Sequence, residues 1–153
     1  GKYYTDSPTL IVRGNKDTHK INNPLLEQII NLAEGNEGTV KFPFMIYGFD
    51  VQPTEDKGYC INIIRRDDLF IVSDERLDGK YNMEKFSDVD DLGLPLFDRN
   101  GIRTWYAKKE GLSGLYLGWD LNMSSNVDPI SNSNDLGRVV LVSAEGANEN
   151  FKK

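Results

Sequence analysis

The sequence predicts an α+β domain in which one principal helix, at about residues 24–34, packs on a mainly antiparallel sheet. Three observations support this class. One segment has the apolar spacing of a helix, several segments alternate apolar and polar residues with a period of two, and an Asn-Gly pair marks a tight turn. The 153 residues contain no stretch of linker composition and no internal repeat, so we expect a single domain spanning 1–153.

The N-terminal third contains a short strand and then the helix. Residues 9–13 are Thr-Leu-Ile-Val-Arg, which favour a strand that ends at Gly14. Asn23 is suited to cap the helix, Pro24 fits its first turn, and Gly35 is the expected stop. The apolar stripe of the helix is Leu25, Leu26, Ile29, Ile30 and Ala33.

The middle of the chain is predicted to be mostly strand. Residues 38–46 and 59–63 alternate with a period of two, and residues 69–72 form a compact apolar run. Pro43 predicts an edge strand or a bulge, because proline cannot donate to a ladder. Residues 65–68, Arg-Arg-Asp-Asp, predict a solvated turn or bulge.

The second half begins with a polar, acidic excursion over residues 73–95, in which we expect one short helical turn near 83–87. Asn100-Gly101 then predicts a hairpin that joins 94–97 to 102–107. Residues 115–123 alternate so regularly that one strand is expected, with its odd positions in the core and its even positions exposed. Residues 138–143 are expected to form a closing buried strand.

Bulk composition limits the functions that we expect. The net charge of −6 argues against a nucleic-acid partner, since an acidic surface repels phosphate. No apolar run approaches the roughly 18 residues of a membrane span. The single cysteine, Cys60, excludes an internal disulfide framework and is expected to be a structural thiol. The chain begins with Gly1, so we expect that it was processed or excised. Its N-terminus therefore gives no expectation about the cellular compartment.

No catalytic or cofactor motif is present in the sequence. His19 is the only histidine, and the many carboxylates carry no information without geometry. Oxygen-bearing residues recur at every second position of 120–128, which resembles the first half of a calcium-binding EF-hand loop. Ser125 replaces the required glycine, and Ser131 stands where the glutamate belongs. We therefore expect no metal and interpret Asp120, Asn122, Ser124, Asn126 and Asp128 as a solvated strand face.

A candidate binding surface lies around residues 118–135, which are rich in Asn, Ser and Asp and are framed by aromatic residues. This mixture is typical of binding surfaces, because Tyr and Trp provide rigid contact area while Ser and Asn provide adaptable hydrogen bonds. The alternation also predicts that Trp119 is a core residue. The predicted ligand-binding residues are Trp105, Tyr106, Tyr116, Asp120, Asn122, Asn126, Asn132 and Asn134.

Part of this region resembles a known family. Residues 118–122 (Gly-Trp-Asp-Leu-Asn), the Asn/Ser-rich stretch to Asp135 and the closing residues 137–142 (Gly-Arg-Val-Val-Leu-Val) are similar to the C-terminal variable region of C-type-lectin-like domains. The similarity is to the kind diversified by retroelements, and it covers about 30 of 153 residues. The resemblance implies a receptor- or ligand-binding role with its site on the exposed residues of 118–135.

The sequence therefore favours a non-enzymatic domain that binds a protein or carbohydrate ligand, lectin-like or receptor-binding, without a cofactor. Two alternatives stay open. One is a carboxylate-dependent hydrolase acting on a glycan. The other is an acidic inhibitory or structural partner protein, whose segment 73–91 would meet a basic surface.

Overall fold

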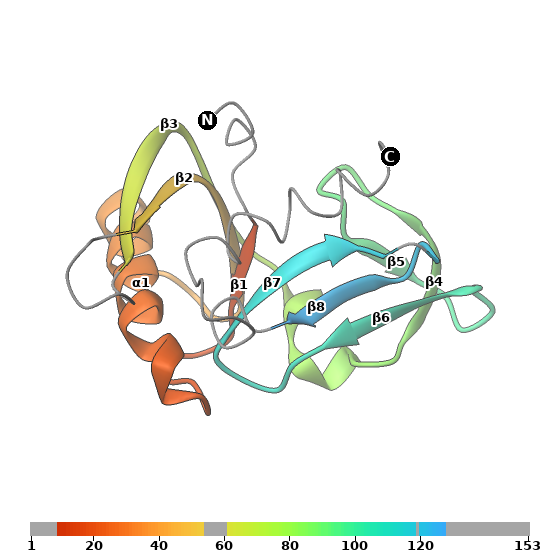
Figure 1. Cartoon of the computed structure of the whole chain (residues 1–153). Coiled ribbons are helices and arrows are strands. Elements are labelled where there is room, and N and C mark those ends of the chain that lie inside the picture. The colour runs from red at the N-terminus through yellow and green to blue at the C-terminus, as the bar shows by residue number, and fades with distance from the viewer. Residues whose placement is uncertain (1–8, 54–60, 119, 128–153) are drawn as a thin grey trace.

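The computed structural model describes residues 9–53, 61–118 and 120–127 (Figure 1). Within these residues the chain forms one α-helix and a single sheet of eight strands, in the order β3-β2-β1-β7-β8-β6-β4-β5. All neighbouring strands are antiparallel except β6 and β8, which are parallel. The predicted α+β class with a mostly antiparallel sheet is confirmed, although strands dominate the fold.

Short 3-10 turns lie before the helix and between β3 and β4. In chain order they are β1 (Leu10–Val12), η2 (Lys20–Asn22), α1 (Asn23–Glu37), β2 (Phe44–Pro53), β3 (Ile61–Ser73), η3 (Glu75–Leu77), η4 (Gly79–Tyr81), β4 (Lys85–Val89), β5 (Pro95–Phe97), β6 (Arg103–Ala107), β7 (Leu112–Leu117) and β8 (Met123–Val127). No helix among the described residues has the length and apolar character to span a membrane. Cys60 and residues 138–143 lie outside the described residues.

Helix α1 buries four residues of the predicted stripe and half-buries the fifth, Ile30, but its two ends differ from the prediction. Asn22 is its N-cap and makes no side-chain capping bond, whereas the Oδ1 atom of Asn23 accepts a hydrogen bond from the backbone N–H of Asp17 at 3.0 Å. Gly35 lies inside the helix. The helix ends at Glu37, and its C-cap is Gly38, where φ is 86° and the N–H donates to the carbonyl of Glu34 at 2.8 Å. A glycine inside a helix costs only about 1 kcal/mol, which packing of the stripe can outweigh.

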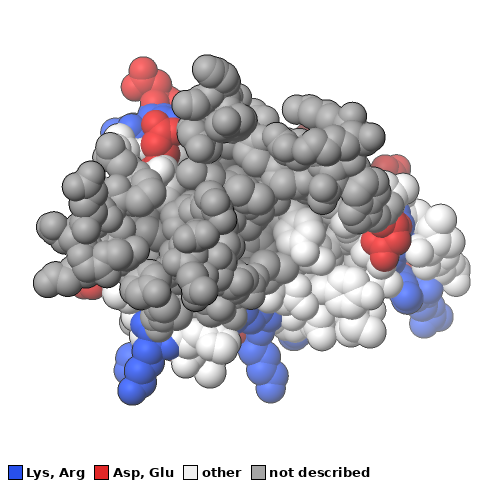
Figure 2. Space-filling view, in the orientation of Figure 1, with Lys and Arg blue, Asp and Glu red and all other residues white. Residues whose placement is uncertain are grey.

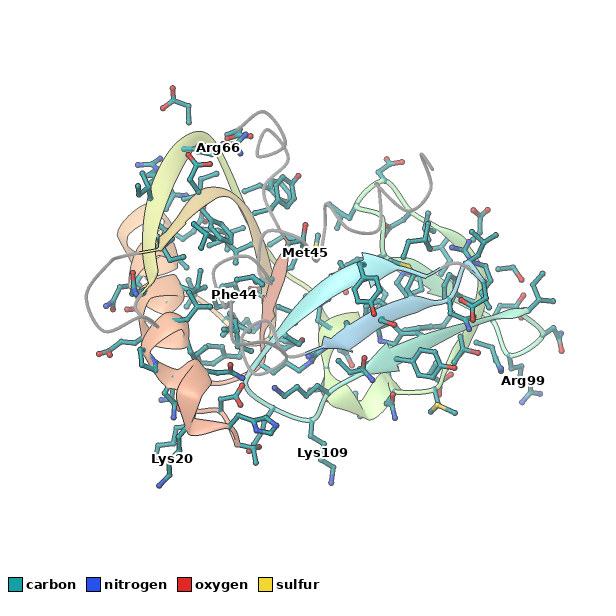
Figure 3. All side chains as sticks on the ribbon, viewed as in Figure 1. Lys20, Phe44, Met45, Arg66, Arg99 and Lys109 are labelled. Atoms are coloured by element: carbon teal, nitrogen blue, oxygen red, sulfur yellow. The ribbon has the colours of Figure 1, made fainter. Side chains whose placement is uncertain are left out.

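Two hydrophobic clusters lie on opposite sides of the sheet. The first contains the α1 stripe together with Leu10, Val12, Phe44 and Ile46, so α1 covers β1, β2 and β3. The second contains Ile11 and Met45 together with Trp105 and other residues of the second half. Neighbours such as Phe44 and Met45 (Figure 3) therefore enter different clusters, as the alternation of a strand requires.

Replacing Ile29 with alanine should lower the free energy of unfolding by roughly 2–5 kcal/mol. The side chain is 0% exposed at the centre of the first cluster, so truncation leaves a cavity. Urea denaturation followed by circular dichroism measures the change. Glu34→Ala on the exposed face of the same helix is the control, and a loss below about 0.5 kcal/mol for Ile29→Ala would contradict the packing described here.

The structure corrects several predicted elements of the first half. The strand expected at 38–46 begins only at Phe44, so Pro43 precedes β2, and β2 is an internal strand between β1 and β3. The bulge expected at 65–68 is present. The β2–β3 register shifts between Tyr47 and Phe49, where Gly48 alone faces four residues of β3.

Two predictions for the excursion and its neighbouring turn are wrong. Residues 85–89 form strand β4 rather than the helical turn expected near 83–87, because they pair with β5 and β6 on both sides. The turn at Asp98–Gly101 forms, with the N–H of Gly101 donating to the carbonyl of Asp98 at 2.7 Å. However, β5 and β6 do not pair with each other, since β4 lies between them.

Candidate functional site

The central strands of the second half bring two of the predicted binding residues into one row. Strands β7, β8 and β6 lie side by side (Figure 1). Ser124 of β8 is in register with Tyr106 of β6 and with Tyr116 of β7. We call Tyr106, Ser124 and Tyr116 the tyrosine row.

The tyrosine row lies on the side of the sheet opposite to the second cluster. Met123 and the neighbours of both tyrosines, among them Trp105 and Leu117, pack into that cluster. The alternation of a strand then directs the tyrosine row to the other side, where all three side chains are half-buried. Leu112 shares this side of β7 and joins the cluster beneath α1. The row is therefore a continuation of the helix-covered side beyond the strands that α1 reaches.

The chemistry of the row combines ring surface and hydroxyl groups. Neighbouring strands are about 4.8 Å apart, so the two tyrosine backbones are separated by roughly 10 Å, with a small serine between them. In the described part of the chain, none of the three hydroxyls makes a hydrogen bond to another residue. Figure 2 shows that the surface over β6, β7 and β8 consists mainly of residues without charge. The row can therefore offer stacking area and hydrogen bonds to a ligand.

The strand expected at 115–123 is in fact two strands joined by a tight turn. The N–H of Gly118 donates to the carbonyl of Asn122 at 2.7 Å, and the N–H of Leu121 donates to the carbonyl of Gly118 at 3.0 Å. The predicted core position Leu121 is consequently 51% exposed. Glycine and a side chain that bonds the local backbone, as in an Asx turn, explain the reversal.

Asp120 and Asn122 stabilise this turn. The carboxylate of Asp120 accepts bonds from the backbone N–H of Asn122 at 3.1 Å and from its Nδ2 at 2.8 Å. The Oδ1 atom of Asn122 accepts from the backbone N–H of Thr104 at 2.7 Å, which ties the turn to β6. Both side chains are thus occupied internally, and Asn122 positions β8 beside β6.

The other predicted site residues lie elsewhere. Trp105 is 0% exposed in the second cluster, because it alternates with Tyr106, and it therefore cannot contact a ligand at the row. Asn126 is exposed where the β7–β8 register shifts. Asn132, Asn134, Trp119 and the calcium-like position Asp128 lie outside the described residues.

An arginine that sequence analysis missed holds β7 and β8 together from the other side of the sheet. Arg13 donates from Nη1 to the Oγ atom of Ser113 at 2.7 Å and from Nη2 to the Oγ atom of Ser125 at 2.9 Å. Its Nε donates to the carbonyl of Leu77 at 2.6 Å. Burial lowers the pKa of the Arg13 guanidinium to about 10, partly offset by the charge of Asp78. The arginine stays protonated at neutral pH and fixes the strands that carry Tyr116 and Ser124.

Two acidic residues of the excursion, Asp74 and Asp90, are also bonded internally. Arg76 forms ion pairs with Asp74 at 2.8 Å and Asp90 at 2.6 Å. Hydrogen bonding to Arg76 lowers the pKa of Asp74. For Asp90, burial acts to raise the pKa, but hydrogen bonds from Arg76 and backbone N–H groups outweigh it and lower the pKa. Within the described ranges no group of three or more His, Cys, Asp or Glu could hold a metal ion.

Comparison of the chain with protein-family models, with curated proteins and with solved structures finds no significant match.

Proposed function

We propose that this protein is a non-enzymatic binding domain whose ligand, a protein or a carbohydrate, contacts the tyrosine row. The observation that supports the proposal is the register Tyr106–Ser124–Tyr116. It sets two half-buried tyrosines on one side of the sheet, with hydroxyls that have no partner among the described residues. Tyrosine is enriched in binding surfaces because it offers apolar area and a hydrogen bond at low entropic cost.

The similarity of residues 118–142 to lectin-like variable regions points to the same part of the chain. The turn at 118–122 and strand β8 belong to that segment, and β8 provides Ser124. A receptor-binding role on this surface is therefore part of the proposal.

The alternative functions receive less support from the described residues. A glycoside hydrolase needs a general acid of raised pKa. The pKa values of Asp74, Glu75 and Asp90 are instead lowered. For an acidic docking segment at 73–91, two of the carboxylates, those of Asp74 and Asp90, are already paired with Arg76.

A ligand screen with paired variants tests the proposal. The parent protein is screened against an array of immobilised glycans and against a random dodecapeptide library displayed on phage. Affinity for each hit is then measured for Tyr106→Ala, for Tyr116→Ala and for the double variant. We expect each single change to weaken binding by about tenfold or more, as hot-spot truncations do.

Tyr47→Ala is the matched control for this screen. Tyr47 is 36% exposed on β2 and stacks on Phe70 with ring centroids 4.9 Å apart, which places it on the side of the second cluster. The Tyr47→Ala variant should bind every hit with the affinity of the parent protein. If both row variants retain parental affinity for all hits, the proposed site is wrong.

A further inference from the structure

Two exposed apolar residues have a backbone conformation that normally requires glycine. Met83 has a φ of 75° and Leu121 a φ of 69°, and they are the only described residues other than glycine with positive φ. This region is costly for a residue with a Cβ atom, because Cβ approaches a carbonyl oxygen. Their side chains are 58% and 51% exposed, so burial does not compensate for the cost.

Two backbone motifs at Met83 both favour glycine. Asn82 has φ −54° and ψ 133°, and the N–H of Glu84 donates to the carbonyl of Tyr81 at 3.1 Å. Met83 is thus the third residue of a type II turn, where glycine is favoured. The N–H of Met83 donates to the carbonyl of Trp105 at 2.7 Å, and the N–H of Trp105 donates to the carbonyl of Glu84 at 2.9 Å. This second pattern is a G1-type bulge, whose first position is also usually glycine.

Both residues are attached to the strand that carries Tyr106. Met83 is bonded to Trp105 from the β4 side of β6. Leu121 precedes β8, on the other side of β6, and its carbonyl accepts a hydrogen bond from the Nε of Arg103 at 2.6 Å. An exposed apolar side chain therefore stands beside β6 on each flank, at positions where local structure would favour glycine.

We propose that Met83 and Leu121 contact the ligand of the tyrosine row, and that this ligand is a polypeptide presenting uncharged, apolar side chains. The inference rests on the proposed function and specifies the partner. A residue that is both strained and exposed does not stabilise the fold. Methionine and leucine side chains would instead add apolar contact area to a protein interface.

The polar groups near the row favour a polypeptide over a glycan. Sugar recognition needs many directional hydrogen-bonding groups, and beyond the three hydroxyls of the row the nearby polar side chains are already bonded: the amide of Asn122 donates to the carboxylate of Asp120 at 2.8 Å. The hydroxyl of Thr104 accepts from Nζ of Lys85 at 2.8 Å. The Arg103 guanidinium lies over the ring of Phe86, on the side of the second cluster, so it adds no charge beside the row. The row and its two exposed neighbours, Met83 and Leu121, carry no charge, so a complementary partner surface is uncharged and apolar.

The test measures stability and binding in the same variants, Met83→Gly and Leu121→Gly. The probe is a synthetic dodecapeptide obtained by selecting the displayed library against the parent protein. Relief of the left-handed strain should raise the melting temperature of each variant by about 2 °C. Loss of the apolar contact should weaken peptide binding by about tenfold. Opposite changes in stability and affinity are not expected of a residue that serves folding alone.

Ile64→Gly is the control, because Ile64 is a 43% exposed apolar residue in β3, at the far edge of the sheet. It should lower the melting temperature and leave peptide affinity unchanged.

The outcomes separate this inference from the proposed function. If Tyr106→Ala and Tyr116→Ala bind the peptide more weakly while both glycine variants bind it with parental affinity, the inference is overturned and the row remains the site. A screen that yields only glycans dependent on the row also overturns it. If the glycine variants melt at a lower temperature than the parent, the strain argument is wrong. Peptides that bind the tyrosine variants with parental affinity contradict the proposed function itself.

Discussion

Replacing Asp17 with asparagine is expected to lower the free energy of unfolding by about 3–5 kcal/mol, the cost of breaking a buried ion pair. The Asp17 side chain is fully buried, and its Oδ2 atom lies 3.2 Å from Nζ of Lys108. The same oxygen accepts from the N–H of Leu112 at 2.7 Å, and Oδ1 accepts from the N–H of His19 at 2.7 Å. Both oxygens thus face donors, so the NH2 group of asparagine meets a donor in either orientation.

The position of Asp17 explains why the loss should be large. Leu112 is the first residue of β7, and Lys108 follows β6, so one carboxylate ties the loop after β1 to the connection between two central strands. Gly111 leaves the space for it, since a Cβ atom at that position would overlap the Asp17 carboxylate. Without the carboxylate, the ammonium group of Lys108, which is 15% exposed, would lose the ion pair at 3.2 Å.

Chemical denaturation of Asp17→Asn, Lys108→Met and the double variant measures this coupling. The single Asp17 change should be the most harmful, and the double variant should recover part of its loss. Glu110→Gln is the control in the same region, because the Glu110 carboxylate accepts an exposed hydrogen bond from Thr18 at 2.9 Å. It should change stability by less than about 0.5 kcal/mol. A loss under about 1 kcal/mol for Asp17→Asn would contradict the role assigned to the pair.

The sequence predicts the parts of this fold that depend on local pattern. The α1 stripe follows from apolar spacing between Leu25 and Ala33, about two and a half turns, and the class follows from the many segments of period two. Tyr116 faces away from the second cluster, as the alternation of its neighbours predicts, whereas its place on the same side as Tyr106 depends on the register of β6, β8 and β7.

Long-range features could not be predicted in the same way. Residues 115–123 alternate so well that the reversal at Gly118–Asn122 is hidden, although Gly118 and Asp120 are residues typical of turns. A turn forms at Asp98–Gly101 rather than the hairpin turn centred on Asn100-Gly101, and nothing local shows that β4 inserts between β5 and β6. Arg13 bonds residues 100 and 112 positions away, so its role depends wholly on tertiary structure.

Gly48→Ala is the second change for which we expect a large loss, about 3 kcal/mol or more in the free energy of unfolding, from backbone strain and overpacking together. Gly48 has a φ of 88°, and a Cβ atom there would lie 2.6 Å from the Cα atom of Leu69 and would overlap the carbonyl group of Asp68. These are backbone atoms of β3, which cannot rotate away as a side chain could. The bulge that joins Tyr47–Phe70 to Phe49–Arg65 would therefore have to open.

Two other glycines separate the causes of this loss. Gly93 has a φ of 81° but open space around its Cβ position, so Gly93→Ala carries only the conformational cost of about 1–2 kcal/mol. Gly35 lies in α1 with neither constraint, and Gly35→Ala should stabilise the protein by about 1 kcal/mol. Urea denaturation should therefore rank the variants Gly35→Ala, parent, Gly93→Ala and Gly48→Ala in falling stability. If Gly48→Ala is no less stable than Gly93→Ala, the close approach of β2 and β3 at this bulge is wrong.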